Sequence, residues 1–336
     1  MLAPLTRLSS LASKPLTLQC TASRISLTLQ SMMSTSSGQP DLYLKGVYSA
    51  IPTTFGPDEE IDFEKFTFNV SKWEKVPLKG YAIGGTNGEQ PFLTEEEKLK
   101  IIRTLRQLTK KTIIAGTYCE STRATIDLTQ KAAQAGANAA LILCPYYFQK
   151  KMTEDLIYEH FISVADNSPI PVIIYNNTFV TGIDISVNTL VKLAHHENIR
   201  GVKDTENIKL ANLSNQTKDL NFSVFAGSAG YLLSGLLVGC AGGINALSAV
   251  LGDPICEVYD LAKKGKWDEA MKLQHRLVKP DVTLMKEMGV PGTRAAMELY
   301  GYYGIDIGIN RYRRNRITTI SFDSYKDHMV PDYKGL

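Results

Sequence analysis

The stretch Ile199-Arg200-Gly201-Val202-Lys203-Asp204-Thr205 places a lysine at the end of a short, mostly apolar run and follows it with polar residues. Low-dielectric surroundings disfavour the charged form of an amine, so a lysine at such a position can act as a nucleophile. The ordinary alternative is an edge-strand lysine whose ammonium reaches out to water. A second apolar run, Pro171–Asn176, ends in Tyr175 and favours the nucleophile. If the two runs are consecutive strands of a parallel barrel, Lys203 and Tyr175 meet at the same mouth.

Eight apolar runs of this kind recur from residue 46 and are separated by segments with helical periodicity. Most are continuous apolar strings, as expected for parallel strands that are buried on both faces. The predicted strands are Gly46–Phe55, Gly80–Gly84, Thr112–Gly116, Ala137–Cys144, Pro171–Asn176, Ile199–Lys203, Phe222–Gly227 and Gly242–Leu247. Strand–helix alternation repeated eight times predicts an α/β fold, a (β/α)8 TIM barrel over residues 41–265.

Capping signals mark two of the helices between these strands. Thr94 precedes three glutamates, which predicts an N-cap followed by an acidic first turn. Ser121 or Thr122 is predicted to begin a helix that ends at Ala135, before Gly136. Further helices are predicted over about 153–166, 186–196, 207–218, 229–239 and 253–264.

Residues 266–336 are predicted to form a C-terminal helical extension that ends in a polar tail. Its predicted helices are Trp267–Leu277, Val282–Met288 and Pro291–Tyr300. The tail carries a basic cluster (Arg311, Arg313, Arg314 and Arg316) that could bind an anion, but a solvated or subunit-facing surface is favoured. The charge pattern predicts no nucleic-acid partner.

Residues 1–40 have the composition of an organelle transit peptide. They are rich in Ser, Thr and Leu, contain Arg7, Lys14 and Arg24, and lack acidic residues. This pattern predicts a disordered leader that directs the chain to mitochondria. The alternatives are an N-terminus that is merely disordered, and an internal start at Met32 or Met33 that would give a cytosolic form.

Three further patterns restrict the class of protein. The five cysteines are widely spaced without a Cys-x-x-Cys pair, which predicts free thiols in a reducing compartment. The five histidines form no ligand set, so neither a metal nor a cofactor is predicted. The uncharged segment Leu220–Gly252 exceeds the roughly 20 apolar residues of a membrane span. Its seven glycines favour a buried strand–helix–strand, so no membrane association is predicted.

The positions just past the carboxyl ends of the strands should form the site of a barrel enzyme. Gly84–Glu89 has closely spaced glycines that let backbone N–H groups approach an anion, with Thr86 and Asn87 beside them. Alone, such a stretch indicates only a turn. Pro145–Phe148 contains adjacent aromatics, which more often serve packing than catalysis. The anion-binding stretch Gly84–Glu89, together with Lys203 and Tyr175 and without metal ligands, indicates Schiff-base chemistry on a small α-keto acid.

Three motifs and the spacing between them resemble the dihydrodipicolinate synthase / N-acetylneuraminate lyase family of class I aldolases over about residues 45–305: Gly85–Glu89, Tyr175-Asn176 and Gly201–Asp204. Five further stretches are similar to the members that cleave 4-hydroxy-2-oxoglutarate in mitochondria, namely Cys119–Thr125, Ala226–Gly230, Lys272–Leu277, Pro291–Gly292 and Gly301–Gly304. The resemblance implies reversible, metal-free cleavage of this acid to pyruvate and glyoxylate. It also implies a homotetramer built as a dimer of dimers.

The resemblance implies catalytic roles for three residues. Lys203 would form the imine with the keto carbon, and Tyr175 would carry the proton to and from the C4 hydroxyl. Tyr147 would match a tyrosine that crosses a dimer interface into the neighbour's proton relay, with Tyr146 as a competitor for that role. Four residues would bind substrate. Thr86 and Asn87 would hold the pyruvyl carboxylate with their side chains and backbone N–H groups, and Thr205 and Gly227 would line the pocket.

The loop after Tyr175 departs from the family pattern. Dihydrodipicolinate synthases usually carry an arginine five residues after the tyrosine, where this chain has Val180, and Asn177–Phe179 replaces a Val-Pro loop. The missing arginine argues against lysine biosynthesis and leaves open how a distal carboxylate is held. The alternatives are cleavage of a 2-keto-3-deoxy sugar acid or sialate, condensation with aspartate semialdehyde, or a silent barrel kept as a scaffold.

Overall fold

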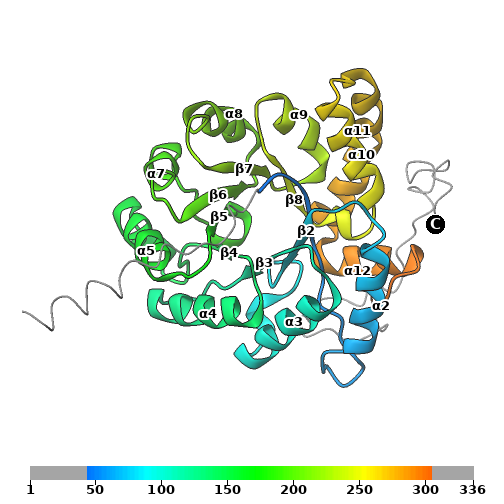
Figure 1. The fold of residues 1–336 in the computed structure, drawn as a ribbon, viewed down its shortest axis with the longest axis horizontal. Helices are drawn as coiled ribbons and strands as arrows, with labels where there is room; N and C mark the ends of the chain where they lie inside the picture. The colour runs from blue at the N-terminus through cyan, green and yellow to red at the C-terminus, as the bar shows by residue number, and fades with distance from the viewer. Residues whose placement is uncertain (1–43, 305–336) are drawn as a thin grey trace, which may run out of the picture. The chain divides into compact units, whose positions relative to one another are not determined.

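The computed structural model describes residues 44–304. Eight parallel strands pair in chain order and close into a barrel, and Figure 1 shows them at the centre of a ring of helices. The strands are β1 Gly46–Ala50, β2 Gly80–Ile83, β3 Thr112–Gly116, β4 Ala139–Ile142, β5 Val172–Asn176, β6 Ile199–Asp204, β7 Ser223–Ala226 and β8 Gly242–Asn245. The predicted TIM barrel is confirmed. The predicted leader and the arginine-rich tail lie outside the described residues.

The helices alternate with the strands and continue after β8. The α-helices are α2 Phe63–Trp73, α3 Glu95–Leu108, α4 Thr122–Ala135, α5 Glu154–Asn167, α6 Thr178–Thr181, α7 Val187–Leu193, α8 Asn207–Gln216, α9 Leu232–Leu237, α10 Gly252–Lys263, α11 Trp267–Asp281 and α12 Gly289–Leu299. Short 3₁₀ turns are η1 Gln90–Phe92, η2 Gln149–Lys151, η3 Ala229–Tyr231 and η4 Leu247–Ala249, and η5 Val282–Glu287 is a π-helix.

Local capping explains where two of the predicted helices begin. Thr94 and Glu97 form a reciprocal capping box at the start of α3, with the Glu97 N–H donating to the threonine hydroxyl and the Thr94 N–H donating to the Glu97 carboxylate. Ser121, the first of the two predicted candidates, caps α4 by accepting from the Ala124 N–H at 3.1 Å. Gly136 ends α4 with φ +108°, which a residue with a Cβ rarely adopts. These boundaries follow from a few neighbouring residues, so the sequence could specify them.

Helix α2 was not among the predicted elements. Asp62 caps it by accepting from the Lys65 N–H at 2.9 Å, and Phe66, Val70 and Trp73 form its buried face. The signals were present in the sequence, but the segment between β1 and β2 is partly polar. Its helical character therefore depends on a narrow stripe of apolar residues.

The C-terminal helices pack back against the barrel. Helix α11 continues four residues beyond the predicted end and contains Pro280 in its last turn. Helix α12 then approaches α2, as Figure 1 shows: Asn69 exchanges two hydrogen bonds with the Tyr303 backbone, at 2.6 and 2.8 Å. The uncharged segment Leu220–Gly252 holds β7, α9 and β8. Within residues 44–304 no helix has both the length and the apolar character needed to cross a membrane.

Candidate active site

Strand register brings Lys203 and Tyr175 together. Strands β5 and β6 pair in parallel, with Tyr175 opposite Lys203 and Asn176 opposite Asp204. Register partners point to the same face of a sheet, so the amine and the phenol share the barrel mouth. The Lys203 Nζ lies 4.3 Å from the centroid of the Tyr175 ring. Lys203 is only 5% exposed and Tyr175 only 4%, so the contact is shielded from bulk water.

Asn176 ties the ends of these two strands to each other. Its side-chain NH₂ donates to Asp204 at 2.9 Å and to Asp184 at 3.1 Å. Its backbone carbonyl accepts from the Thr205 hydroxyl at 3.4 Å. Burial raises the pKa of Asp204, and the hydrogen bond from Asn176 opposes that rise. Since Asn176 follows Tyr175 and Asp204 follows Lys203, this bond joins the ends of β5 and β6 beside the phenol and the amine.

Three polar groups surround the Tyr175 hydroxyl: the Asn177 amide, the Thr86 hydroxyl and the Lys203 amine. The Asn177 amide donates to it at 2.8 Å, and the Thr86 hydroxyl lies 3.4 Å away. Burial alone would raise the pKa of the Tyr175 phenol. The Lys203 ammonium and the hydrogen bonds from its polar neighbours outweigh burial and lower that pKa below its ordinary value. A larger fraction of Tyr175 is therefore present as phenolate at neutral pH than of an ordinary tyrosine.

The loop Gly84–Glu89 presents backbone donors at the same mouth. Gly84 has φ +61°, and a Cβ on Gly88 would lie 2.9 Å from the Gly84 nitrogen, so both positions require glycine. Within residues 44–304, no acceptor is found for the backbone N–H of Thr86 or Asn87. The Asn87 side chain is buried and donates to the Ala50 carbonyl at 2.6 Å. Its amide thus holds the loop against β1, while the two N–H groups remain able to bind a carboxylate.

A buried ion pair anchors this loop to the C-terminal extension. The Arg294 guanidinium of α12 contacts the Glu89 carboxylate at 2.6 Å and donates to the Thr53 carbonyl at 2.6 Å. Both charged side chains are only 2% exposed. The Thr53 hydroxyl also donates to the Gly88 carbonyl, at 2.7 Å. Sequence reasoning missed Arg294, because nothing near it in the chain indicates its partner.

The loop after β7 is held in a similar way. The Gly227 N–H donates to the Asp204 carbonyl at 2.9 Å. A Cβ on Gly227 would lie 2.7 Å from that oxygen and 3.1 Å from the Thr205 methyl, so only glycine fits beside Thr205. The next residue, Ser228, donates its hydroxyl to the buried carboxylate of Asp281 on α11. The structure therefore places Thr205 and Gly227 side by side, with Thr205 two residues along the chain from Lys203.

Tyr147 lies apart from this cluster within the single chain. It is 76% exposed on the loop after β4, where the Glu120 carboxylate accepts the backbone N–H groups of Tyr146 and Tyr147 at 3.0 and 2.8 Å. Tyr118, which sequence reasoning did not single out, is buried close to Tyr175. Burial, with a smaller effect of Tyr175, raises the Tyr118 pKa well above its ordinary value. Its place two residues past β3 was the signal that could have found it.

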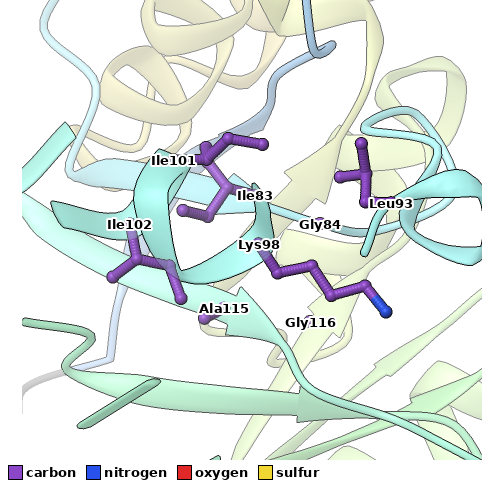
Figure 2. A pocket seen from close by; sticks show the side chains of 8 residues that line it. All are labelled: Ile83, Gly84, Leu93, Lys98, Ile101, Ile102, Ala115 and Gly116. Atoms are coloured by element: carbon purple, nitrogen blue, oxygen red, sulfur yellow. The ribbon is translucent and has the colours of Figure 1, made fainter. Parts of the chain in front are cut away.

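A small cavity between α3 and strands β2 and β3 is a separate feature (Figure 2). Its volume of about 10 Å³ would suit one water molecule. The Lys98 side chain lines it, and burial lowers the pKa of this lysine. Because Ile101 and Ile102 of α3 also line it, the cavity lies on the helix side of the strands and not in the mouth. Among the described residues, no cluster of three His, Cys, Asp or Glu side chains could hold a metal ion.

Comparison with known proteins gives three kinds of match. The sequence model of the dihydrodipicolinate synthetase family matches residues 43–319. The L-threo-3-deoxy-hexylosonate aldolase of Hypocrea jecorina is 33% identical over 77% of this chain and 87% of its own length. A probable mitochondrial 4-hydroxy-2-oxoglutarate aldolase of Emericella nidulans is 31% identical over 77% and 86%. The crystal structure of a dihydrodipicolinate synthase from Bacillus anthracis is 30% identical, covers 79% of this chain and 92% of that one, and superposes with a TM-score of 0.73.

Proposed function

Because this chain belongs to the dihydrodipicolinate synthetase family, a family of class I pyruvate-dependent aldolases and lyases, we propose that it cleaves 4-hydroxy-2-oxoglutarate reversibly to pyruvate and glyoxylate. The observation that carries the proposal is the buried pairing of Lys203 with Tyr175 across β5 and β6. The relative from Emericella nidulans supports this substrate. The relative from Hypocrea jecorina supports the second candidate, a 2-keto-3-deoxy sugar acid.

The first step is imine formation on Lys203. Its neutral amine attacks the C2 keto carbon. The keto oxygen then takes one proton from the attacking nitrogen and one from the protonated Tyr175, and it leaves as water, so that the phenolate is restored. Tyr175 lies against the amine. Because its pKa is lowered, more of it is phenolate, and this phenolate accepts the proton that the Lys203 ammonium must lose before attack. The protonated imine then withdraws electrons from the C3–C4 bond.

The second step breaks that bond. The Tyr175 phenolate takes the proton from the C4 hydroxyl, the new carbonyl forms, and the C3–C4 electron pair moves into the C=N group. Glyoxylate leaves and an enamine of pyruvate remains on Lys203. Tyr175 returns its proton to C3, and water hydrolyses the imine, which releases pyruvate and restores the amine. Each proton that Tyr175 accepts is given back, so the cycle balances without a metal or cofactor.

The binding roles follow the free polar groups of the mouth. The backbone N–H groups of Thr86 and Asn87 hold the pyruvyl carboxylate, and Thr205 and Gly227 line the space beside the imine. Val180 is uncharged and only partly buried. The aldehyde half of the substrate therefore meets no cationic side chain at that position.

The cellular and subunit context completes the proposal. Residues 1–40 are a mitochondrial transit peptide, 41–265 the barrel, and 266–336 the C-terminal helices and tail; the mitochondrial name of the Emericella nidulans relative supports this address. The protein is a homotetramer in which Tyr147 enters the neighbour's proton relay, which the exposed side chains of Tyr147 and Phe148 support. Sedimentation equilibrium would contradict this assembly if the protein were a monomer.

Borohydride trapping with pyruvate tests the chemistry. Reduction should fix one pyruvate per chain, and mass mapping should place it on Lys203. Lys203→Ala should abolish both the label and cleavage. Lys98→Met is the matched control, since Lys98 is also partly buried with a lowered pKa but lies outside the mouth, and it should keep the label. A label on Lys98 in place of Lys203 would exclude the imine on Lys203, and the absence of any label would favour a silent scaffold.

A substrate comparison tests the specificity. Cleavage of 4-hydroxy-2-oxoglutarate should exceed that of 2-keto-3-deoxy sugar acids and sialate, and condensation of pyruvate with aspartate semialdehyde should be slower still. A higher kcat/KM for a sugar acid would transfer the assignment to the second candidate and leave the imine chemistry intact.

A further inference from the structure

Asn177 uses its backbone and its side chain for different purposes. It is the N-cap residue of α6, and its carbonyl accepts from the N–H groups of Val180 and Thr181, both at 3.0 Å. Asparagine at such a position usually caps the helix with its side chain as well. Here no side-chain cap bond is made, and the amide donates to the Tyr175 hydroxyl at 2.8 Å. Asn177 is 7% exposed, so water does not compete strongly for that bond.

The bond restricts where the phenolic hydrogen can point. A side-chain NH₂ group is a donor only, so it occupies a lone pair of the Tyr175 oxygen. The hydrogen of the phenol must then point away from Asn177. The Thr86 hydroxyl, 3.4 Å from the same oxygen, lies in one of the remaining directions. The Lys203 amine, which also hydrogen-bonds this oxygen, lies in another.

We propose that Asn177 is a positioning residue for Tyr175, whose amide turns the exchangeable proton of the phenol toward Lys203 and Thr86 and stabilises the oxygen after the proton has left. This inference rests on the proposed function, in which Tyr175 must give and take protons on the side of the imine. The donor stays bonded in both protonation states, whereas a hydroxyl in its place could also accept the proton. Asn177 therefore occupies one lone pair of the Tyr175 oxygen, and the phenol exchanges no proton on that side.

The other groups that face the phenol come from three further elements. Lys203 on β6 is the cation. Tyr118 after β3 and Tyr231 in η3 are buried phenols whose pKa values are raised first by burial, with Tyr175 a smaller cause. Both therefore stay neutral at ordinary pH. Asn177 and Thr86 supply the remaining hydrogen bonds to Tyr175.

Asn177→Leu tests the proposal, because leucine has a similar volume but no donor. Two measurements are made on the full-length protein: the pH profile of cleavage, and the titration of Tyr175 by NMR with ¹³C-labelled tyrosine, assigned through Tyr175→Phe. Loss of a hydrogen bond to a charged oxygen should raise the pKa of Tyr175 by about one unit or more. The limb of the pH profile in which activity rises with pH should move to higher pH by the same amount. Borohydride trapping of pyruvate on Lys203 should persist, since the Asn177 amide donates to Tyr175 and not to the amine.

Asn177→Asp provides a second variant that keeps the shape of the side chain. Its carboxylate beside the phenol should raise the Tyr175 pKa further than leucine does. Asn198→Leu is the matched control: Asn198 is a half-buried asparagine just before β6, and its amide donates to the Ala165 and Ser168 carbonyls, both at 2.9 Å. That variant should be less stable, but it should change neither the pH profile of cleavage nor the NMR titration of Tyr175.

Two results would overturn the inference. An unchanged Tyr175 titration in both Asn177 variants would show that the amide only fills space. A titration that moves to lower pH in Asn177→Leu would show that the amide accepts from the phenol. If the unmodified protein fails to trap pyruvate, the proposed function fails, but the NMR titration still decides whether Asn177 controls the phenol.

Discussion

The two sides of the barrel mouth are held by different kinds of contact. On the β5–β6 side, the amine and the phenol are fixed by register and by the bond between Asn176 and Asp204, which follow them directly in the chain. The loop after β2, across the barrel, is fixed by Arg294, and the loop after β7, next to β6, is fixed by Asp281; both residues belong to the C-terminal helices. The residues of the proposed chemistry therefore lie on one pair of strands. The loops proposed to bind the substrate depend on a segment that folds against them from outside the barrel repeat.

This difference separates two kinds of defect. Changes on the β5–β6 side should lower turnover with little loss of stability, because the barrel remains closed by its backbone hydrogen bonds. Changes at the C-terminal contacts should lower stability and substrate affinity together, because each leaves a buried charge without its partner.

Tyr175→Phe should show the largest effect and define the β5–β6 side. Removal of the hydroxyl should lower kcat for cleavage by about 10²- to 10⁴-fold, the usual contribution of general acid–base catalysis. Pyruvate trapping on Lys203 should remain measurable, and the thermal midpoint should change little. Turnover close to that of the unmodified protein would exclude Tyr175 as the acid–base group.

Arg294→Met should show the next largest effect and test the opposite side. It leaves Glu89 buried opposite an apolar side chain, so the free energy of unfolding should fall by about 3–5 kcal/mol. KM should rise more than kcat falls, because the Gly84–Glu89 loop carries the proposed carboxylate donors. Urea unfolding and steady-state kinetics would measure both changes.

The double variant Glu89→Gln/Arg294→Met should recover part of that stability, since it removes both charges. Arg106→Met is the control. Arg106, at the end of α3, donates to the Lys111 carbonyl at 2.8 Å and to Asn138 at 3.0 Å, and its loss should leave KM unchanged. The comparison fails if Arg294→Met affects neither stability nor KM.

His160 should show the smallest effect, in the helical shell outside the mouth. Burial lowers its pKa from 6.5 to about 4, and its ring contacts the Thr122 hydroxyl at 2.9 Å. The unfolded chain therefore binds a proton between pH 6.5 and 4 that the folded chain excludes, so stability falls as pH falls through this window. The total loss in the free energy of unfolding between pH 6.5 and 4 should approach about 3 kcal/mol.

Urea unfolding of the unmodified protein and of His160→Gln over this pH range would isolate the effect. The difference between their stabilities should change by that amount between pH 6.5 and 4, while the pH profile of cleavage keeps its shape. If His160→Gln moved the pH profile of cleavage, the shell and the mouth would not be independent.

Several features were predictable because they depend on neighbouring residues. The eight apolar runs predicted the strands, and Thr94 and Gly136 marked helix boundaries through contacts within one turn. Even the meeting of Lys203 with Tyr175 followed from local patterns, because parallel strands of one repeat place their carboxyl ends at a common mouth. The departure of Asn177 from the family loop was visible in the sequence too. Its bond to the phenol was not.

Other features were decided only when the barrel closed and the C-terminal helices packed on it. The pairing of Arg294 with Glu89 joins residues far apart in the chain, and each alone resembles an ordinary surface charge. Likewise, Asp281 acquires its partner only because α11 passes the loop after β7. The physical reason is that periodicity and capping are energies between near neighbours, whereas a buried charge is tolerated only where the folded chain supplies its counterpart. The meeting of the proposed reactive pair was thus determined by the sequence of two adjacent strands, and the loops around it were determined by tertiary packing.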